Sequence, residues 1–334
     1  MLIIEKIRAS AEVLTRYDWK IWYFGDNVGF RGLICASRML AVPRFLDFCY
    51  GIAKSWESAF KKWKKFDQTL PGAEILDLAC SYNDEALKTR MVKFAQWLSE
   101  SPRHAGFYLT DDDYRSKLWV DTIAFHSPFL SKLALEEKLD DYYQRALDFL
   151  LPNVAVLRDS SHLFCHTYDV YRGETNKVHW ARGQGWAMWG LYHTWASLPD
   201  KIRERQEVSS ILAETLNEVV KYQRDDGHWN TVVDDASSGL ETSLAPFYVA
   251  IACEAVERGI IEKHRHIKHI EMAWNGIREV WRENGIYGGV SADTLSGDAE
   301  YYRGIPIQEC SPWAEGPPII AAEAYHRFAP RNRE

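Results

Sequence analysis

Two kinds of helix-forming segment alternate along the chain, and this alternation limits the possible folds more than any other property of the sequence. Segments rich in apolar and small residues begin near positions 27, 72, 121, 183, 241 and 314. More charged segments lie between them, such as 84–99, 201–224 and 263–283. A helix that is apolar on all sides is buried, whereas a one-sided helix faces water. Six inner and six outer helices in alternation predict a closed ring of helix hairpins, an all-α (α/α)6 barrel that takes in residues 1–334 as a single domain.

Stop and start signals separate the helix-forming segments. Pro43 divides two of them, because proline is tolerated at a helix start but not inside a helix. Strand-like alternation is short and rare, and residues 227–233 are the best strand candidate. The expected helices span residues 3–18, 27–41, 44–64, 72–81, 84–99, 121–137, 139–156, 183–197, 201–224, 241–258, 263–283 and 314–328.

The segments just before the inner helices carry unusual side chains. Each joins an aromatic or charged residue to a helix start, as in 22–26, 66–72, 118–121, 179–182, 240–243 and 311–316. In a ring of inner helices these starts converge at one end, which predicts one pocket with a mix of side chains suited to a sugar. Ordinary N-capping explains the Asp, Ser and Thr residues at these positions but not the tryptophans.

The segment from Val178 to Leu191 is the clearest of these helix starts. Its aromatic and polar residues pass through two glycines into an apolar run, which indicates a loop leading into a buried helix. Trp180, Arg182 and Trp186 are expected around the helix mouth, where free backbone N–H groups and the dipole favour an anion. Arg182 adds a fork suited to a carboxylate, and tryptophan faces stack on sugar rings. These residues predict a bound carboxylated sugar; in the alternative, the tryptophans are core residues and Arg182 caps the surface.

Composition excludes several other classes of function. The formal net charge of −7 argues against a nucleic-acid partner, and residues 61–65 are the only dense basic run, typical of a solvated helix face. Six scattered cysteines form no C-x-x-C pair, so no metal site is expected from them. No apolar stretch approaches the length of a membrane span, and the first residues lack the features of a signal peptide. A cytoplasmic protein is expected.

Two motifs resemble one enzyme family. At Trp119-Val120-Asp121 and at residues 179–186 (HWARGQGW) the sequence resembles the unsaturated rhamnogalacturonyl hydrolases of glycoside hydrolase family 105, with the unsaturated glucuronyl hydrolases of family 88 as more distant kin. Similar segments in the same order are 67–72, 166–169, 240–243 and 312–316. The resemblance implies an (α/α)6 barrel that removes a 4,5-unsaturated uronic acid from the non-reducing end of an oligosaccharide left by a polysaccharide lyase. It implies no metal and no organic cofactor.

The resemblance also implies roles for single residues. Asp121 matches the general acid/base, and Asp67 matches the second active-site carboxylate. The residues that would line the uronate subsite are Tyr23, Trp119, His166, Trp180, Arg182 and Trp186. In the expected reaction, protonated Asp121 gives its proton to C4 of the substrate's vinyl ether. Burial beside Trp119 and a nearby charge on Asp67 would favour that protonated form.

The sequence departs from the family at one place, and it leaves two alternative functions possible. Where many family members carry a histidine and a basic residue before the W-x-D motif, this chain has an acidic loop, Asp111-Asp112-Asp113. A sugar epimerase on the same barrel is the first alternative, because such enzymes use histidine pairs and the chain offers His126, His166 and His179. A sugar-binding protein without turnover is the second alternative.

Overall fold

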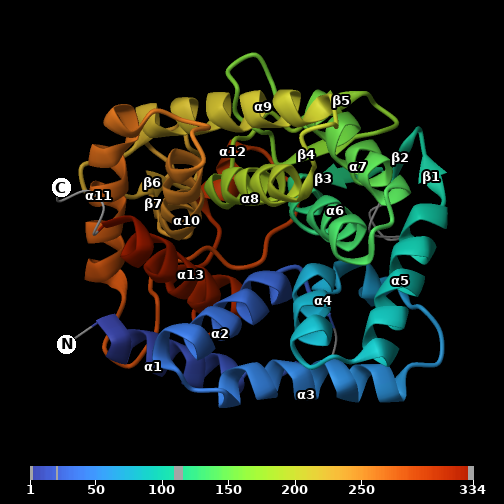
Figure 1. The fold of residues 1–334 in the computed structure, drawn as a ribbon. Helices are drawn as coiled ribbons and strands as arrows, with labels where there is room; N and C mark the ends of the chain where they lie inside the picture. Colours follow the sequence, from blue (N-terminus) through green and yellow to red (C-terminus); the bar gives the residue numbers. More distant parts are fainter. Residues whose placement is uncertain (1–2, 20–21, 109–115, 330–334) are drawn as a thin grey trace.

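Six helices form a closed inner ring in the computed structural model, which describes residues 3–19, 22–108 and 116–329 (Figure 1). They are α2 (Asp26–Leu40), α4 (Gly72–Ser81), α6 (His126–Glu137), α8 (Ala181–Ser197), α10 (Leu244–Glu257) and α13 (Pro312–Phe328). Each packs against the next in this order, and α13 packs against α2, which closes the ring. The first and last inner helices are therefore neighbours although most of the chain lies between them.

Six more helices surround this ring. They are α1 (Ile3–Thr15), α3 (Arg44–Ala59), α5 (Glu85–Glu100), α7 (Asp141–Leu157), α9 (Glu204–Val219) and α11 (Lys263–Val280). Inner and outer helices alternate in sequence, so the predicted all-α (α/α)6 barrel is confirmed. Among the described residues, no helix combines the length and the apolarity needed to cross a bilayer.

The two rings differ in burial as the sequence predicts. Helix α8 is buried along nearly its whole length, including the polar Arg182 and Gln184. Helix α9 buries one stripe instead, in which Val208, Leu212 and Leu216 recur at the spacing of one helix face. The largest shift from the expected starts is in the third inner helix, which begins at His126 rather than near 121. Residues before it form the short 3-10 helix η2 (Val120–Ala124).

Glycines set the closest contacts between helices. A Cβ on Gly32 of α2 would lie 2.7 Å from the Cα of Gly316 on α13, so the contact that closes the ring requires a glycine on both helices. A Cβ on Gly190 of α8 would lie 2.1 Å from the carbonyl oxygen of Ile123. Helix η2 therefore rests directly on the α8 backbone, and this contact fixes the segment that contains Asp121.

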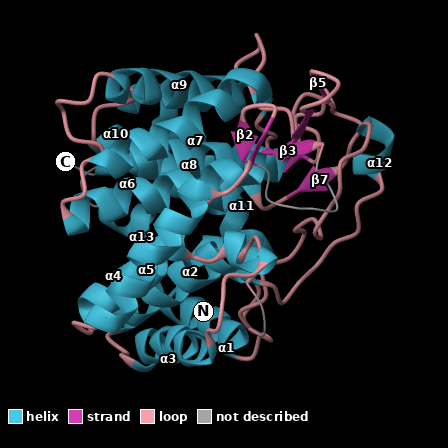
Figure 2. Ribbon diagram, turned by 90° about the vertical axis from the view of Figure 1, so that its right-hand side faces the viewer, coloured by secondary structure: helices cyan, strands magenta, loops and turns pink. Residues whose placement is uncertain are grey.

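Short strands and long loops lie together beside one end of the helices (Figure 2). The antiparallel pairs are β1 (Arg103–His104) with β2 (Phe107–Tyr108), β3 (Lys117–Trp119) with β4 (Thr167–Asp169), β4 with β5 (Glu174–Thr175), and β6 (Trp229–Asn230) with β7 (Leu240–Glu241). The smaller helices are η1 (Lys65–Thr69), η3 (Val220–Tyr222) and α12 (Ala299–Arg303). The strand expected over 227–233 is wrong in length, because only Trp229 and Asn230 pair as a strand.

Candidate active site

A cavity of about 490 Å³ opens where the inner helices begin. Five of the eight expected site residues line it: Tyr23, Trp119, Asp121, His166 and Trp180. The other residues that line it are Phe24, Thr69, Thr122, Phe125, Asp293, Thr294, Leu295 and Tyr301. Of the six segments expected to converge here, 22–26, 66–72, 118–121 and 179–182 contribute side chains, whereas 240–243 and 311–316 do not, and His166 and residues 293–301 take part instead. We call this space the site cavity.

Asp121 is presented to the site cavity by a strand and a short helix. Strand β3 pairs with β4 so that Trp119 lies opposite Thr167, and the Val120 N–H donates to the His166 carbonyl at 2.9 Å. Asp121 follows at once in η2, with 14% of its side chain exposed. Its Oδ2 atom lies 3.4 Å from His166 Nε2 and has no hydrogen-bond partner. This buried oxygen is therefore free to accept the His166 ring nitrogen's hydrogen, and the exposed part of the carboxyl faces the site cavity.

His166 connects Asp121 to a buried tyrosine. The ring is almost fully buried, and its Nδ1 atom is hydrogen-bonded to the Tyr302 hydroxyl. Burial raises the pKa of Tyr302, so the hydroxyl keeps its proton and can donate it to His166 Nδ1 or to the Leu295 carbonyl at 3.4 Å. A neutral imidazole that accepts at Nδ1 carries its hydrogen on Nε2. His166 then directs an N–H group toward the Asp121 carboxylate.

Two tryptophans form walls of the site cavity. Trp180, the residue before α8, is 1% exposed, and its Nε1–H has no partner. Trp119 meets His166 edge to face at a centroid distance of 5.1 Å, and His166 lies 4.6 Å from Trp180. The three rings form a continuous aromatic surface beside Asp121. Such a surface offers a sugar ring apolar area, and Trp180 offers it a hydrogen-bond donor.

Arg182 lies behind the site cavity and is absent from its lining. The side chain is fully buried, and its two terminal nitrogens donate to the carbonyl oxygens of Ser291 and Ala292. Its guanidinium carbon lies 4.3 Å from the Trp180 ring. Burial lowers the pKa of Arg182 to about 10, so the group remains a cation at neutral pH. Arg182 holds the segment that leads to Asp293, which lines the site cavity, instead of facing a ligand.

Trp186 also lies beneath the site cavity. It is fully buried in α8 and packs edge to face against Phe24 and Phe125 at centroid distances of 6.4 and 6.0 Å. Both phenylalanines line the site cavity. Trp186 therefore supports the cavity floor, which agrees with the alternative view of this tryptophan as a core residue.

Asp67 is turned away from the site cavity. Its Oδ2 atom accepts the Lys64 backbone N–H at 2.7 Å, which caps η1, and its Oδ1 atom accepts Trp56 Nε1–H at 3.2 Å. Burial raises the pKa of Asp67, and these two hydrogen bonds oppose that effect. Thr69 of the same short helix reaches the site cavity, whereas Asp67 lines a neighbouring one. Both carboxylate oxygens thus have structural partners.

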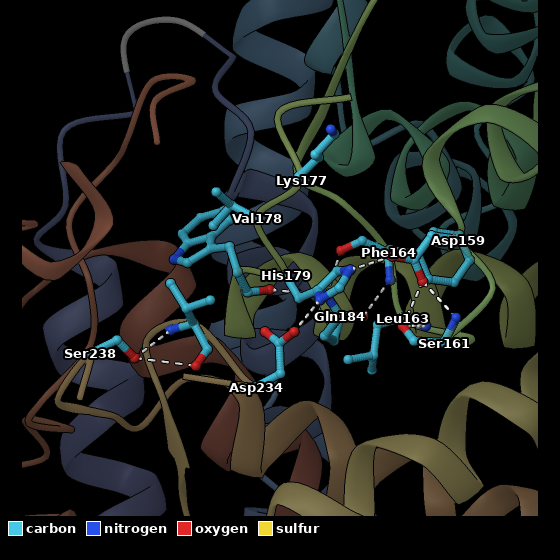
Figure 3. A network of polar contacts seen from close by, with 12 residues as sticks. Asp159, Ser161, Leu163, Phe164, Lys177, Val178, His179, Gln184, Asp234 and Ser238 are labelled. Atoms are coloured by element: carbon cyan, nitrogen blue, oxygen red, sulfur yellow. Dashed lines mark hydrogen bonds and ion pairs between the residues drawn. The ribbon is translucent and has the colours of Figure 1, made fainter. Parts of the chain in front are cut away.

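The residue before Trp180 is held by two carboxylates (Figure 3). His179 Nδ1 lies 2.8 Å from Asp234, and its Nε2 lies 2.9 Å from Asp159. Burial works to lower the pKa of His179, but hydrogen bonds to Asp234 and Cys165 and nearby charges outweigh it and raise the pKa to about 10. His179 is thus an imidazolium in an ion triplet. The thiol of Cys165 completes a group of three potential metal ligands whose atoms lie within 4.8 Å of one another.

Gln184 has a structural role within the 179–186 segment. Its side-chain amide donates to the Phe164 carbonyl at 2.7 Å and accepts the Phe164 N–H at 2.9 Å (Figure 3). This two-way hydrogen bond fixes the backbone two residues before His166. Residues 179–186 therefore position several elements of the site cavity, and only Trp180 among them lines it.

Two residues of the site were not predicted from the sequence. Asp293 lines the site cavity as a second carboxylate, and its Oδ2 atom accepts the Tyr23 hydroxyl at 2.7 Å. Tyr302, in α12, is the partner of His166. Neither residue lies in a recognisable motif or beside the start of an inner helix, so no local signal pointed to them. Glu241 holds the loop before Asp293 by accepting the Ser291 N–H at 3.0 Å.

The histidines that supported an epimerase lie apart from one another. Only His166 lines the site cavity. His126 is bound to the Gln68 carbonyl at 3.0 Å, and burial lowers its pKa to about 4. His179 is held in the ion triplet outside the cavity lining. The arrangement offers no histidine pair across a ligand. The acidic loop Asp111–Asp113 lies outside the described residues.

Comparison with known proteins gives a family match over nearly the whole chain. The family model described as Glycosyl Hydrolase Family 88 matches residues 4–329. An unsaturated rhamnogalacturonyl hydrolase, YesR, from Bacillus subtilis is 23% identical over 206 residues, which is 61% of this chain and 58% of the relative. An unsaturated 3S-rhamnoglycuronyl hydrolase from Formosa agariphila is 22% identical over 198 residues, 54% of this chain and 52% of the relative. The matched regions thus span little more than half of each curated relative.

Solved structures share the fold. A possible member of family GH105 from Salmonella enterica serovar Paratyphi A superposes with a TM-score of 0.86 at 20% identity, covering 96% of this chain and 93% of the other. The unsaturated glucuronyl hydrolase from Bacillus sp. GL1 superposes with a TM-score of 0.72 at 13% identity, covering 97% and 95%. At these identities the likeness establishes the barrel and its topology.

Proposed function

The chain belongs to Glycosyl Hydrolase Family 88, and we propose that it removes a 4,5-unsaturated uronic acid from the non-reducing end of lyase-generated oligosaccharides. The observation that carries the proposal is the Asp121 oxygen without a hydrogen-bond partner, 3.4 Å from His166 Nε2 and beside the aromatic walls of the site cavity. The names of two curated relatives, both hydrolases of unsaturated uronides, support the same substrate class.

The unsaturated sugar would bind against the aromatic surface of Trp119 and Trp180. Among the described residues, the lining of the site cavity contains no lysine or arginine. The substrate carboxylate would therefore meet neutral donors such as Trp180 Nε1–H. The buried charge of Arg182, whose guanidinium lies 4.3 Å from the Trp180 ring, would attract the carboxylate from behind. Binding would orient C4 and C5 of the sugar toward Asp121.

The proposed reaction is a hydration of the C4=C5 vinyl ether. Asp121 donates its proton to C4, and positive charge develops on C5 and the ring oxygen. The Asp121 carboxylate then takes a proton from the water that attacks C5. The product is a hemiketal, which opens to a ketone at C5. The resulting hemiacetal at C1 releases the rest of the oligosaccharide as an alcohol.

His166 and Arg182 support the two states of Asp121 in this scheme. After proton transfer the Asp121 carboxylate would accept the N–H of His166, which Tyr302 directs toward it. The buried cation of Arg182 also favours that carboxylate by charge. We assign Asp67 a positioning role, because its oxygens cap η1 and bind Trp56. Asp293 is the second carboxylate on the site cavity and would stabilise the developing cation.

Replacing Asp121 tests this proposal. We expect Asp121→Asn to lower kcat by about 10³-fold or more, because the amide has no acidic proton to donate. The measurement is the loss of ultraviolet absorbance of the conjugated uronate in a lyase-digested pectin oligosaccharide. Asp225→Asn, an exposed carboxyl in a loop, is the matched control. Near wild-type rates in Asp121→Asn, with an unchanged circular dichroism spectrum, would reject the assignment.

A further inference from the structure

A second, larger cavity lies next to the site cavity. It has a volume of about 850 Å³. Three tryptophans, Trp19, Trp22 and Trp56, line it together with three lysines, Lys61, Lys62 and Lys64. We call this space the lysine–tryptophan cleft. These three lysines belong to the basic run 61–65, which composition alone attributed to a solvated helix face.

Two segments of the chain contribute residues to both cavities. Trp22 lines the cleft, and the next residue, Tyr23, lines the site cavity. In the same way Asp67 lines the cleft, and Thr69 lines the site cavity. The cleft is completed by the last turn of the outer helix α3, which packs against both α2 and α4. A ligand that leaves the site cavity along this side would therefore meet segments that also line the cleft.

The floor of the cleft offers a sugar both apolar area and a free donor. Trp22 and Trp56 pack edge to face with centroids 5.8 Å apart. Trp22 is 5% exposed, and its Nε1–H is buried without a hydrogen-bond partner. The Nε1–H groups of Trp19 and Trp56 are both occupied, by Leu14 and Asp67. A buried unpaired N–H costs free energy unless a ligand supplies an acceptor.

The rim of the cleft is positive on a negative protein. Lys61, Lys62 and Lys64 are exposed, and none forms an ion pair within the described part of the chain. The chain as a whole has a formal net charge of −7. Lys54, in the outer helix α3 that leads to this run, is by contrast paired with Asp84 at 2.8 Å. Three unpaired cations beside an aromatic floor match a ligand that is both a sugar and an anion.

We propose that the lysine–tryptophan cleft binds acidic sugar units of the oligosaccharide beyond the bond that is broken. The direction of the chain through the two cavities rests on the proposed function, whereas binding of an acidic saccharide to the cleft does not. An unsaturated sugar in the site cavity would place its aglycone near Trp22. Carboxylate or sulfate groups on the next units would then meet the three lysines.

Kinetics on substrates of two lengths test the proposal. We expect the triple variant Lys61→Gln, Lys62→Gln, Lys64→Gln to raise KM about tenfold for an unsaturated tetrasaccharide with acidic units, because three exposed charge contacts each contribute modestly. Its KM for an unsaturated disaccharide, which is too short to reach the cleft, should stay within about twofold. The difference in tetrasaccharide KM between the lysine triple variant and wild type should shrink at high salt, since exposed charges are screened. Lys93→Gln, Lys263→Gln, Lys268→Gln is the matched control with the same change in charge, and all three residues are exposed.

Direct binding separates the cleft from the proposed activity. Saturated oligogalacturonides lack the C4=C5 bond and are not substrates, so their binding is measured by calorimetry without turnover. We expect wild type to bind them more tightly than neutral oligosaccharides of equal length, and both the lysine triple variant and Trp22→Phe to weaken binding. If the protein binds these oligogalacturonides but cleaves no unsaturated sugar, the result supports the proposal for the cleft and contradicts the proposed function.

Three results would overturn the proposal for the cleft. The first is equal affinity for saturated acidic and neutral oligosaccharides in wild type. The second is an equal effect of the lysine triple variant and the control triple variant on tetrasaccharide KM. Binding of short DNA with the same lysine dependence, and no preference for acidic saccharides, would likewise show a general polyanion surface in place of a sugar site.

Discussion

The residues of the 179–186 segment illustrate what a motif predicts about a single side chain. The sequence identified Trp180, Arg182 and Trp186 as important, and the structure surrounds each with specific contacts. The direction of each side chain was not predictable. It depends on partners more than a hundred residues away, such as the carbonyls of Ser291 and Ala292 that Arg182 binds. Trp180 and Asp121 were placed in the cavity correctly because a strand or a helix start presents them directly.

Because Arg182 is buried, its replacement should have a different effect from the replacement of an arginine that binds the substrate carboxylate directly. We expect Arg182→Met to lower the free energy of unfolding by about 3–5 kcal/mol, because it leaves two carbonyls unpaired and the buried Glu241 without its nearby cation. Urea unfolding measures this, and activity assays on the folded fraction should show a fall in kcat as the Asp293 segment shifts.

A clamp that faces the substrate would behave otherwise. Its loss would raise KM and leave unfolding unchanged. Arg172→Met removes an arginine whose side chain is 74% exposed and serves as the control. Unfolding curves that coincide for Arg182→Met, Arg172→Met and wild type would contradict the role of Arg182 in holding the segment that leads to Asp293.

At the scale of elements, helices were predictable and the loops between them were not. Periodicity and composition gave the twelve principal helices with starts mostly within a few residues, because burial imposes a pattern on each helix. Strands of two or three residues carry no such pattern, so β3 and β4 were missed although they present Asp121 and His166. The loop before α8 is fixed by an ion triplet, which joins three separate segments and leaves no local signal.

The ion triplet makes a prediction about pH. The folded pKa of His179, about 10, lies above its ordinary value, so the stability that the charge contributes is complete below about pH 6.5 and is lost as the pH rises through about 10. We expect His179→Gln to cost about 2 kcal/mol at pH 6, less than a fully buried pair because Asp159 and Asp234 are 41% and 37% exposed.

Urea unfolding at pH 6, 8 and 10 measures the effect of His179→Gln. The gap between wild type and variant should close toward pH 10. The control is His264→Gln, since His264 is exposed on α11 with 76% of its side chain accessible. A gap that stays constant over this range, or that widens with pH, would exclude a charged His179 as the source of the stability.

At the scale of the whole molecule, the site depends on closure of the ring. The site cavity takes its lining from the segments before α2, α4, α6 and α8 and from the loop before α13, so these elements must stay in register around the circle. The first and last inner helices complete it where Gly32 meets Gly316. The order of the helices was predictable from the sequence. This contact was not, because a glycine inside a helical pattern does not indicate which residue it will contact.

The closing contact between α2 and α13 tolerates no added methyl group. A Cβ on Gly316 would lie 2.3 Å from the Val28 carbonyl oxygen and 2.7 Å from its carbon, and backbone atoms cannot move aside as a flexible side chain can. We expect Gly316→Ala to destabilise the protein by about 1–3 kcal/mol through overpacking. It should also lower kcat below the melting temperature, since Tyr23 and Phe24 of the site cavity directly precede α2.

The matched control is Gly51→Ala on the outer helix α3, where nothing lies within 4 Å of an added Cβ. There the same change should raise stability by about 0.5–1 kcal/mol, because alanine favours a helix more than glycine does. Thermal unfolding of both variants, and the absorbance assay with an unsaturated disaccharide too short to reach the lysine–tryptophan cleft that Gly51 lines, give the comparison. The two variants are expected to change stability in opposite directions only if backbone contact at Gly316 keeps α2 and α13 together. A stabilised Gly316→Ala with full activity would mean that α2 and α13 have room to separate, and the site cavity would then need another source of rigidity.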